Sequence, residues 1–196
     1  MFEVRIHGRG GQGVVTAAEL LSVAAFLEGR HAQAFPSFGS ERTGAPVVAY
    51  CRIADREIRT REPIVAPDAL IVQDPTLLHQ VAVFEGLRPD GYLLINSTQP
   101  VAELGIGEVT ARLRAERLLV VPATALAQRI LGRPVPNAVL LGGFAAASGV
   151  VSIDSVTAAI RDRFSGPVAE RNVAAAEEAF GFVRGEIQEI GEITHA

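Results

Sequence analysis

Residues 2–28 read FEVRIHGRGGQGVVTAAELLSVAAFLE, and three local patterns follow one another within them. Residues 2–7 alternate and are rich in β-formers, so they predict a first strand. Residues 8–13 are rich in glycine and predict a tight turn. Residues 12–28 are apolar on almost every side, which is typical of a buried helix. A strand, a glycine turn and a buried helix in this order predict the first βα unit of an α/β domain.

The rest of the chain continues this alternation of short apolar strands and helices. Strands are predicted at residues 31–35, 47–53, 69–72, 91–96 and 118–121, with 57–60 as the second arm of a hairpin. Helices are predicted at residues 74–85, 108–116, 123–131, 137–148, 153–164 and 168–184. The pattern favours a single α/β domain with a twisted, mostly parallel sheet, helices on both faces and an antiparallel part from the hairpin. We expect residues 1–185 to form this domain and residues 186–196 to form a mobile C-terminal tail.

Composition excludes several functions for this chain. It has 196 residues, 48% of them hydrophobic, with a net charge of −4, which supports one sizeable core and no nucleic-acid partner. All 18 basic residues are arginine, so no lysine is present for a phosphate loop or a Schiff base. The single cysteine, Cys51, cannot hold an iron–sulfur cluster, which needs about four thiolates. The four histidines lack the spacing of a metal site.

No apolar run reaches the roughly 20 residues that a membrane-spanning helix needs. The N-terminus enters the first strand directly, without a basic-then-apolar leader. We therefore expect a cytoplasmic protein that does not bind a membrane.

The glycine turn matches the G-x-G-x-x-G spacing of a Rossmann-like first βα turn at Gly8, Gly10 and Gly13. Three interpretations stay open. The glycines can serve only the turn, or the free N–H groups of the following helix can bind a phosphate or another anion, with Arg9 assisting. Independent binding of NAD or FAD is the third. It lacks the acidic residue expected about 20 residues later, because the strand at 31–35 carries no carboxylate.

Residues 36–46, PSFGSERTGAP, predict a loop that concentrates polar side chains between prolines and glycines. Such loops often carry binding residues, and Arg42 could pair bidentately with a carboxylate or a phosphate. A hydrated surface loop is the alternative.

Four further residues have mainly structural interpretations. Cys51 lies in an apolar strand and is assigned to the core. His7 ends the first strand, and Asp74, before a proline, is typical of a helix cap. Asn96 ends a strand where a doubly wound sheet forms a crevice, so binding and a turn role are both open. No catalytic residue and no metal ligand is assigned.

The glycine turn and the segment PSFGSERTG at 36–44 together resemble the gamma subunits of 2-oxoacid:ferredoxin oxidoreductases, or the equivalent domain of single-chain pyruvate enzymes. PDALIV at 67–72, PAT at 122–124, GRPVPN at 132–137 and Asn172 with its following alanines also match. The resemblance covers about residues 1–185 and is strongest to the pyruvate and ketoisovalerate branch. It implies contacts with an anion or coenzyme A at Gly8, Arg9, Gly10, Gly11, Gln12 and Gly13. It also implies a loop facing a partner or the active site at Pro36, Ser37, Phe38, Gly39, Ser40, Glu41, Arg42, Thr43 and Gly44.

The family implies a division of labour among subunits. Its enzymes use thiamine diphosphate and Mg²⁺ to decarboxylate a 2-oxoacid, and they pass electrons through 4Fe–4S clusters to ferredoxin or another acceptor. Coenzyme A usually takes the acyl group. This chain lacks the thiamine signature and the cluster cysteines, so the resemblance assigns the chemistry to alpha, beta and delta-type subunits. The isolated chain is then expected to bind no cofactor and to be inactive. A free-standing Rossmann-type nucleotide-binding oxidoreductase and a purely structural assembly subunit are the alternatives.

Overall fold

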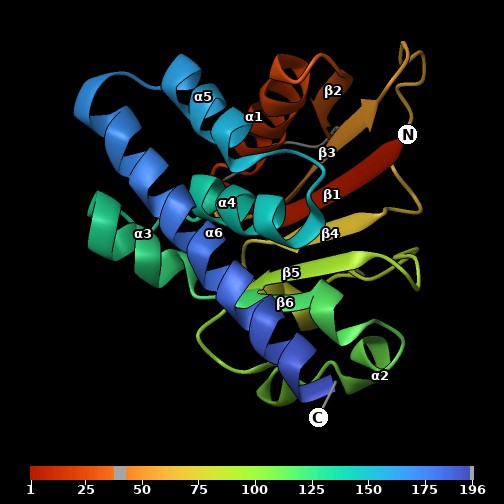
Figure 1. Ribbon diagram of the computed structural model, residues 1–196. Helices are drawn as coiled ribbons and strands as arrows, with labels where there is room; N and C mark the ends of the chain where they lie inside the picture. Colours follow the sequence, from red (N-terminus) through yellow and green to blue (C-terminus); the bar gives the residue numbers. More distant parts are fainter. Residues whose placement is uncertain (38–42, 195–196) are drawn as a thin grey trace.

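A computed structural model describes residues 1–37 and 43–194, and a six-stranded sheet forms its centre (Figure 1). The order of the strands across the sheet is β2-β3-β1-β4-β5-β6. Their bounds are β1 (Phe2–Arg9), β2 (His31–Pro36), β3 (Pro46–Ala54), β4 (Ala69–Val72), β5 (Tyr92–Asn96) and β6 (Leu118–Val121). The predicted strands are present apart from the second arm of the hairpin, and the single α/β domain is confirmed.

The sheet is parallel on one side of β1 and antiparallel on the other. Strands β1, β4, β5 and β6 run parallel, whereas β3 runs antiparallel to both β1 and β2. The predicted hairpin with residues 57–60 is wrong. Both edges of β3 are already paired, from Phe2↔Ile53 on one side and His31↔Ala54 on the other. Residues 57–60 therefore find no free edge on β3, and they form a loop.

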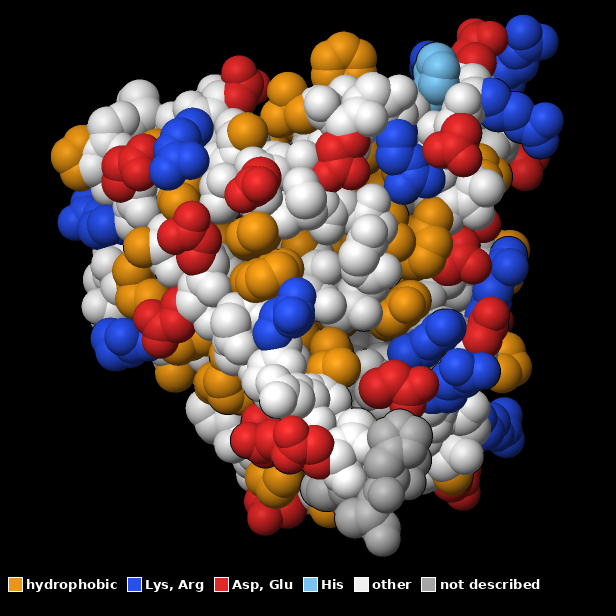
Figure 2. Space-filling view, viewed as in Figure 1, with side chains coloured by type: hydrophobic (Ala, Val, Ile, Leu, Met, Phe, Trp, Pro, Cys, Tyr) orange, Lys and Arg blue, Asp and Glu red, His pale blue; other side chains and the backbone are white. Residues whose placement is uncertain are grey.

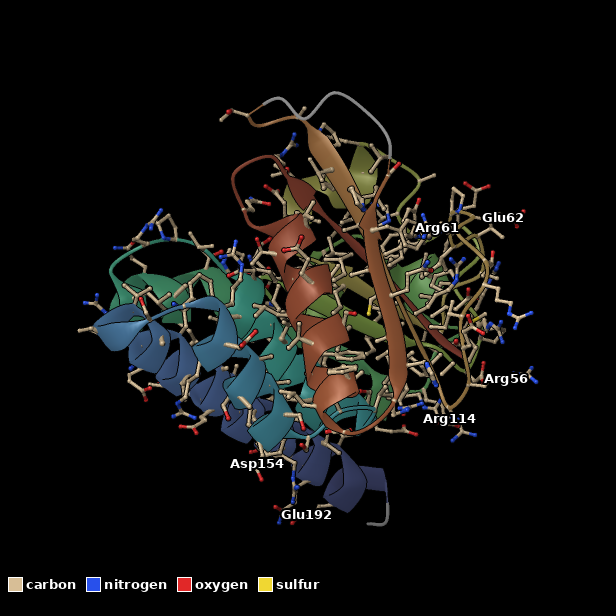
Figure 3. All side chains as sticks on the ribbon, turned by 90° about the horizontal axis from the view of Figure 1, so that it is seen from above. Arg56, Arg61, Glu62, Arg114, Asp154 and Glu192 are labelled. Carbon is tan, nitrogen blue, oxygen red and sulfur yellow. The ribbon has the colours of Figure 1, made fainter. Side chains whose placement is uncertain are left out.

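The long helices all pack on one face of the sheet, and the loop at residues 55–67 lies beyond the other face (Figure 3). These helices are α1 (Val14–Leu27), α3 (Ala123–Leu131), α4 (Asn137–Ser148), α5 (Ile153–Arg163) and α6 (Gly166–Thr194). Helix α4 is buried on nearly every side because it lies between the sheet and α6, which explains its uniformly apolar sequence. Figure 2 views this helical face and shows acidic and basic side chains interspersed, with apolar ones exposed between them.

The opposite face carries short helical turns in place of long helices. They are η1 (Pro75–His79), η2 (Val101–Glu103), α2 (Gly107–Thr110) and η3 (Ala115–Arg117). They cover a smaller apolar cluster that includes Leu70, Leu77 and Leu93. The helices predicted at 74–85 and 108–116 are therefore much shorter than expected. In the second segment only Val109, Thr110 and Leu113 are half-buried and the other residues are exposed, so packing stabilises too little of a longer helix.

Two arginines on the strands hold the loops of this second face. Arg5, 7% exposed, donates hydrogen bonds to the carbonyl oxygens of Ile64, Val83 and Glu85. Because the Val83 and Glu85 carbonyls accept from Arg5, residues 80–86 turn instead of continuing the predicted helix. Arg52 similarly pairs with Glu3 at 2.8 Å and donates to the Glu62 carbonyl at 2.6 Å.

Helix α6 is longer than predicted. It continues through residues 187–194, so the region expected to be a mobile tail is helical up to Thr194. Ile187 packs against the main core, which extends the apolar side of the helix beyond residue 184. Within residues 1–37 and 43–194, no helix is long and apolar enough to span a bilayer.

Candidate functional site

The glycine turn is shorter than its sequence predicts. Strand β1 continues through Gly8 and Arg9, which pair with Val47 and Pro46 of β3, and the turn itself occupies residues 10–13. Gly13 has φ of 71° and directly precedes α1. A Cβ atom on Gly13 would lie 2.4 Å from Nδ2 of Asn137, so α4 approaches the turn too closely for any side chain there. Packing thus accounts for this glycine without a ligand.

Hydrogen bonds join the turn to the base of the second motif. The Gly10 N–H donates to the Ala45 carbonyl at 2.9 Å, and the Gly44 N–H donates to the Gly10 carbonyl at 3.1 Å. Arg9 Nη1 also donates to the Gly44 carbonyl at 3.0 Å. Of the predicted loop, Pro36, Ser37, Thr43 and Gly44 are described, and Phe38, Gly39, Ser40, Glu41 and Arg42 lie outside the described residues. The two segments that carry the resemblance therefore meet in space, although residues 14–35 separate them in the sequence.

A polar cluster lies at the carboxyl ends of β1 and β4, beside the glycine turn. Gln12 accepts from the Arg9 N–H at 2.8 Å and donates to Asp74 at 2.8 Å. Arg9 Nη2 donates to Thr76 at 2.8 Å and to Gln80 at 2.6 Å, and Arg9 Nε lies 3.3 Å from an Asp74 oxygen. These bonds fix the Arg9 side chain and connect the turn to η1.

Asp74 has the capping role predicted for it. Its carboxylate accepts from the Thr76 N–H at 3.0 Å at the start of η1. Burial opposes ionisation of this carboxyl group, but the hydrogen bonds from Thr76 and Gln12 and the charge of Arg9 outweigh burial and lower its pKa. A carboxylate held ionised by so many donors is a poor proton donor, so Asp74 is suited to a structural role.

Beneath this cluster the buried polar groups are also structural. Asn96 Nδ2 donates to the Gln73 carbonyl and to Thr124 Oγ1, both at 2.7 Å, which ties β4 to β5 and α3. The turn role is therefore the one that the contacts of Asn96 support. His7 is 7% exposed, and burial, assisted by the charge of Arg5, lowers its pKa to about 4. Gln73 is fully buried, and neither polar atom of its side chain has a partner within the described residues.

No nucleophile with an adjacent base is present at this edge of the described structure. Cys51 is fully buried in β3, as predicted, and burial raises the pKa of its thiol to about 12. Helix α1, in contrast, has no side-chain cap and no acidic residue in its first turn. Its first N–H groups are therefore available as donors to an anion. The described residues at this edge are therefore suited to bind an anion and not to transfer a proton. Among the described residues, no group of three or more His, Cys, Asp or Glu is placed to hold a metal.

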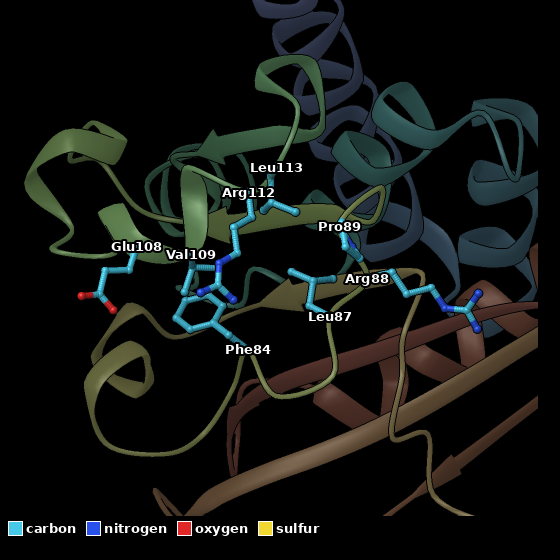
Figure 4. Close-up of a pocket in the computed structure, with 8 residues that line it drawn as sticks. All are labelled: Phe84, Leu87, Arg88, Pro89, Glu108, Val109, Arg112 and Leu113. Atoms are coloured by element: carbon cyan, nitrogen blue, oxygen red, sulfur yellow. The ribbon is translucent and has the colours of Figure 1, made fainter.

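Two cavities flank the glycine turn and share Gly11, Gly13 and Thr16 among their lining residues. One, of about 320 Å³, lies on the side of Arg9 and β3. The other, of about 250 Å³, lies on the helical side. A further cavity of about 250 Å³ opens between Phe84, Leu87 and Val109 (Figure 4). Its residues lead into the amino ends of β5 and β6, away from the glycine turn at the carboxyl end of β1.

Comparison with known proteins assigns the chain to a family. A family model described as pyruvate ferredoxin/flavodoxin oxidoreductase matches residues 3–182. The chain belongs to this family. It is 48% identical over 182 residues to the pyruvate/ketoisovalerate oxidoreductases common subunit gamma of Pyrococcus abyssi, covering 92% of this chain and 96% of that one. It is 49% identical over 186 residues to pyruvate synthase subunit PorC of Methanosarcina barkeri, covering 95% and 99% of the two chains.

A solved structure of the pyruvate ferredoxin/flavodoxin oxidoreductase family has the same fold. The crystal structure of pyruvate oxidoreductase subunit PORC from Thermotoga maritima matches with a TM-score of 0.77 and 35% identity. The match covers 92% of this chain and 95% of that chain. The resemblance to gamma subunits of the pyruvate and ketoisovalerate branch is confirmed.

Sequence reasoning missed most partners of the glycine turn. Gln73, Thr76, Gln80 and Asn137 did not stand out, because each depends on which elements the fold brings together. One signal was available: Gln73 and Asp74 directly follow a buried strand, where the carboxyl edge of a parallel sheet gathers polar side chains.

Proposed function

We propose that this chain is the gamma subunit of a multi-subunit 2-oxoacid:acceptor oxidoreductase and that it carries no catalytic residue itself. The observation that supports this most is the hydrogen-bonded junction of the glycine turn with the base of the 36–44 loop. It builds a donor-rich edge, and Asp74, the carboxylate described there, is held ionised by Thr76, Gln12 and Arg9 and is a poor proton donor. Such an edge is suited to contact a ligand or a partner subunit. Because the chain belongs to the pyruvate ferredoxin/flavodoxin oxidoreductase family, the partner would be another subunit of such an oxidoreductase.

In this proposal the redox chemistry belongs to alpha, beta and delta-type subunits. Thiamine diphosphate with Mg²⁺ would decarboxylate pyruvate or a related branched-chain or aryl 2-oxoacid. Iron–sulfur clusters would carry the electrons to ferredoxin or another acceptor, and coenzyme A would take the acyl group. The single cysteine of this chain is in the core and is unsuited to hold a cluster.

The proposed contribution of this chain is positioning. The segment from Gly8 to Gly13 would offer its turn and the first N–H groups of α1 to an anionic group such as a coenzyme A phosphate. The loop from Pro36 to Gly44 would face the partner subunit or its active site. Arg9 connects both segments to η1 through Thr76 and Gln80, so its loss would disturb the geometry of the whole edge.

The test is the reconstituted complex with Arg9→Gln in this subunit. Arg184→Gln, an exposed change on α6, is the matched control. We expect Arg9→Gln to lower kcat/KM for the 2-oxoacid or coenzyme A about tenfold, the effect of losing one charge-assisted contact. The control should leave it unchanged. Equal kinetics for both variants would leave only the assembly role, and oxidation of pyruvate by the isolated chain would refute the subunit proposal.

The free-standing dehydrogenase is the less favoured alternative. In a dinucleotide-binding sheet, the strand beside β1 is parallel and ends in an acidic residue that holds the ribose. Here β3 is antiparallel to β1, and β2, the next strand in sequence, is an edge strand without a carboxylate. Asp74, beside β1 on the other side, is occupied by Arg9, Gln12 and Thr76. Fluorescence titration of the purified chain with NADH separates the two: saturable binding in the micromolar range would revive the alternative.

A further inference from the structure

Strand β2 lies at an edge of the sheet, and its outer side is unpaired within the described part of the chain. Figure 1 shows it at the margin of the sheet beside α1. The Ser37 N–H donates to the Val48 carbonyl at 2.8 Å, so the backbone groups of Ser37 and of every second residue before it face β3. The N–H and C=O groups of Ala32 and Ala34 therefore point away from the sheet.

This edge lacks the features that usually prevent a strand from pairing with another chain, which are charged side chains, prolines, bulges and short length. Residues 31–36 read HAQAFP and contain no Lys, Arg, Asp or Glu. Their pairing with β3 is continuous from His31↔Ala54 to Pro36↔Ala49. Pro36 is the last residue of the strand, so it leaves the outward N–H groups before it free. The strand at the other edge, β6, has only four residues.

An exposed aromatic side chain and an unpaired amide oxygen lie beside this edge. Phe26, near the end of α1, is 70% exposed. It lines an open cavity of about 520 Å³ together with His31, Ala32 and Gln33 of β2. The Oε1 atom of Gln33 is buried and has no hydrogen-bond partner among the described residues. An acceptor in this state costs free energy that a donor from another chain would recover.

We infer that two copies of this chain associate by pairing their β2 strands in antiparallel orientation, with Gln33 beside the two-fold axis. A second copy fits because residues 31–36 bring no like charges of Lys, Arg, Asp or Glu together across the axis. The Gln33 amide complements itself, since Nε2–H of one copy supplies the donor that Oε1 of the other lacks. The two α1 helices, which pack on β2, then lie on the same face of the joined sheet, where Phe26 gains apolar cover.

The backbone selects one register for this pairing. When Ala32 lies opposite Ala34 of the second copy, every outward N–H and C=O group of both residues is bonded. A shift in one direction places Ala32 opposite Pro36, which has no N–H to donate. A shift in the other direction places Ala34 opposite Arg30, whose N–H already donates to the Ala25 carbonyl at 3.1 Å. Gln33 therefore lies opposite Gln33 of the second copy.

Sedimentation velocity of the full-length purified chain from about 1 to about 100 µM tests the association. We expect at least about half of the parent chain to be dimeric at the highest concentration. Gln33→Glu places two carboxylates opposite each other and should weaken dimerisation about tenfold or more. Gln128→Glu, the same chemical change at an exposed position of α3, is the control and should dimerise like the parent.

A disulfide tests the register. The two Gln33 residues form a non-hydrogen-bonded antiparallel pair, whose Cα atoms lie about 4.5 Å apart, within the range of a disulfide. Gln33→Cys should therefore cross-link into a dimer with diamide as the oxidant, as seen on a non-reducing gel. His31→Cys is the control, because its two copies would lie roughly 14 Å apart along the strands. Cys51 is fully buried and should not react.

Three results would overturn the inference. A parent chain that stays monomeric at about 100 µM would leave the β2 edge to a strand of another subunit. Equal dimerisation of the parent and Gln33→Glu would show that β2 is not the contact, and equal cross-linking of the two cysteine variants would show that the register is wrong. None of these measurements needs another subunit, so they do not depend on whether the proposed role in the complex is correct.

Discussion

His7 connects the burial of a single side chain to the stability of the fold. Its pKa falls from an ordinary 6.5 to about 4, first because burial disfavours the charged ring and second because Arg5 is close. The unfolded chain takes up a proton on His7 as the pH falls below 6.5, whereas the folded chain does not until about pH 4. Stability is therefore lost between these values, by about 3 kcal/mol at most, and no further through His7 below pH 4.

Urea unfolding of the parent chain and of His7→Gln between pH 7.5 and pH 4 measures this loss. The variant has no titrating ring, so its free energy of unfolding should fall less steeply over that interval than that of the parent. His31→Gln, at an exposed histidine, is the control and should keep the parent slope. Identical slopes for the parent and His7→Gln would contradict the assignment.

The role of a residue could be predicted where its neighbours in the sequence determine it. It could not be predicted where side chains from distant segments must meet in space. Cys51 in an apolar strand and Asp74 before a proline each follow from their neighbours in the chain. Arg133, Arg163 and Arg171 are surface arginines in three separate segments, and only the packing of α4, α5 and α6 brings them together. Nothing in their local sequence distinguishes them from Arg161, which is paired.

Between elements, Gly142 allows α4 and α6 to approach backbone to backbone. A Cβ atom at this position would lie 1.9 Å from the carbonyl oxygen of Ala176, which belongs to the backbone of α6 and cannot rotate away. The two helices would have to separate, and α6 would lose contact along the α4 surface. We expect Gly142→Ala to destabilise the chain by about 2 kcal/mol or more, as overpacking of a core does.

The matched change on the open side of α6 should have the opposite sign. Gly181→Ala adds a methyl group where no atom lies within 4 Å, and alanine favours a helix over glycine by about 0.5–1 kcal/mol. The urea midpoint should therefore fall for Gly142→Ala and rise for Gly181→Ala. An equal fall for both variants would contradict this explanation, because the effect would then not depend on the close approach at Gly142.

Helices and strands were predictable where burial matched local preference. The segments 118–121, 123–131 and 137–148 begin and end as predicted, because turn residues bound each apolar run. The predictions at residues 57–60 and 80–85 are wrong for tertiary reasons. Both edges of β3 are already paired, and Arg5 holds the carbonyls of Val83 and Glu85 in a turn. Residues 186–196 were assigned to a tail, although Ile187 continues the buried side of α6 and the helix extends to Thr194.

At the scale of the whole molecule, the class of fold followed from the sequence and the strand order did not. Alternating strands and helices indicate a parallel sheet, but the sequence does not say that β3 inserts between β1 and β2. That insertion brings Ala45 and Gly44 beside Gly10 and so creates the junction between the two motifs. The family resemblance indicated that the glycine turn and the 36–44 segment are both important. That the two segments touch could be seen only from the strand order of the sheet.

The two faces of the sheet should differ in local stability. The helical face buries a large apolar cluster under long helices, whereas the other face rests on short turns and on arginine contacts with loop carbonyls. We expect backbone N–H groups of η2 and α2 to exchange with deuterium at least about thirtyfold faster than those of α4, a difference of about 2 kcal/mol in opening free energy.

Arg5→Gln tests whether this second face opens as a separate unit. The shorter side chain cannot reach the carbonyls of Ile64, Val83 and Glu85 together, so the loops around them lose their common anchor. Exchange at residues 62–66 and 81–87 should accelerate about tenfold or more while α4 and α6 keep their protection. If exchange instead accelerated equally on both faces, the sheet and its two coverings would unfold as one cooperative unit. Arg5 would then stabilise the whole domain rather than one layer of it.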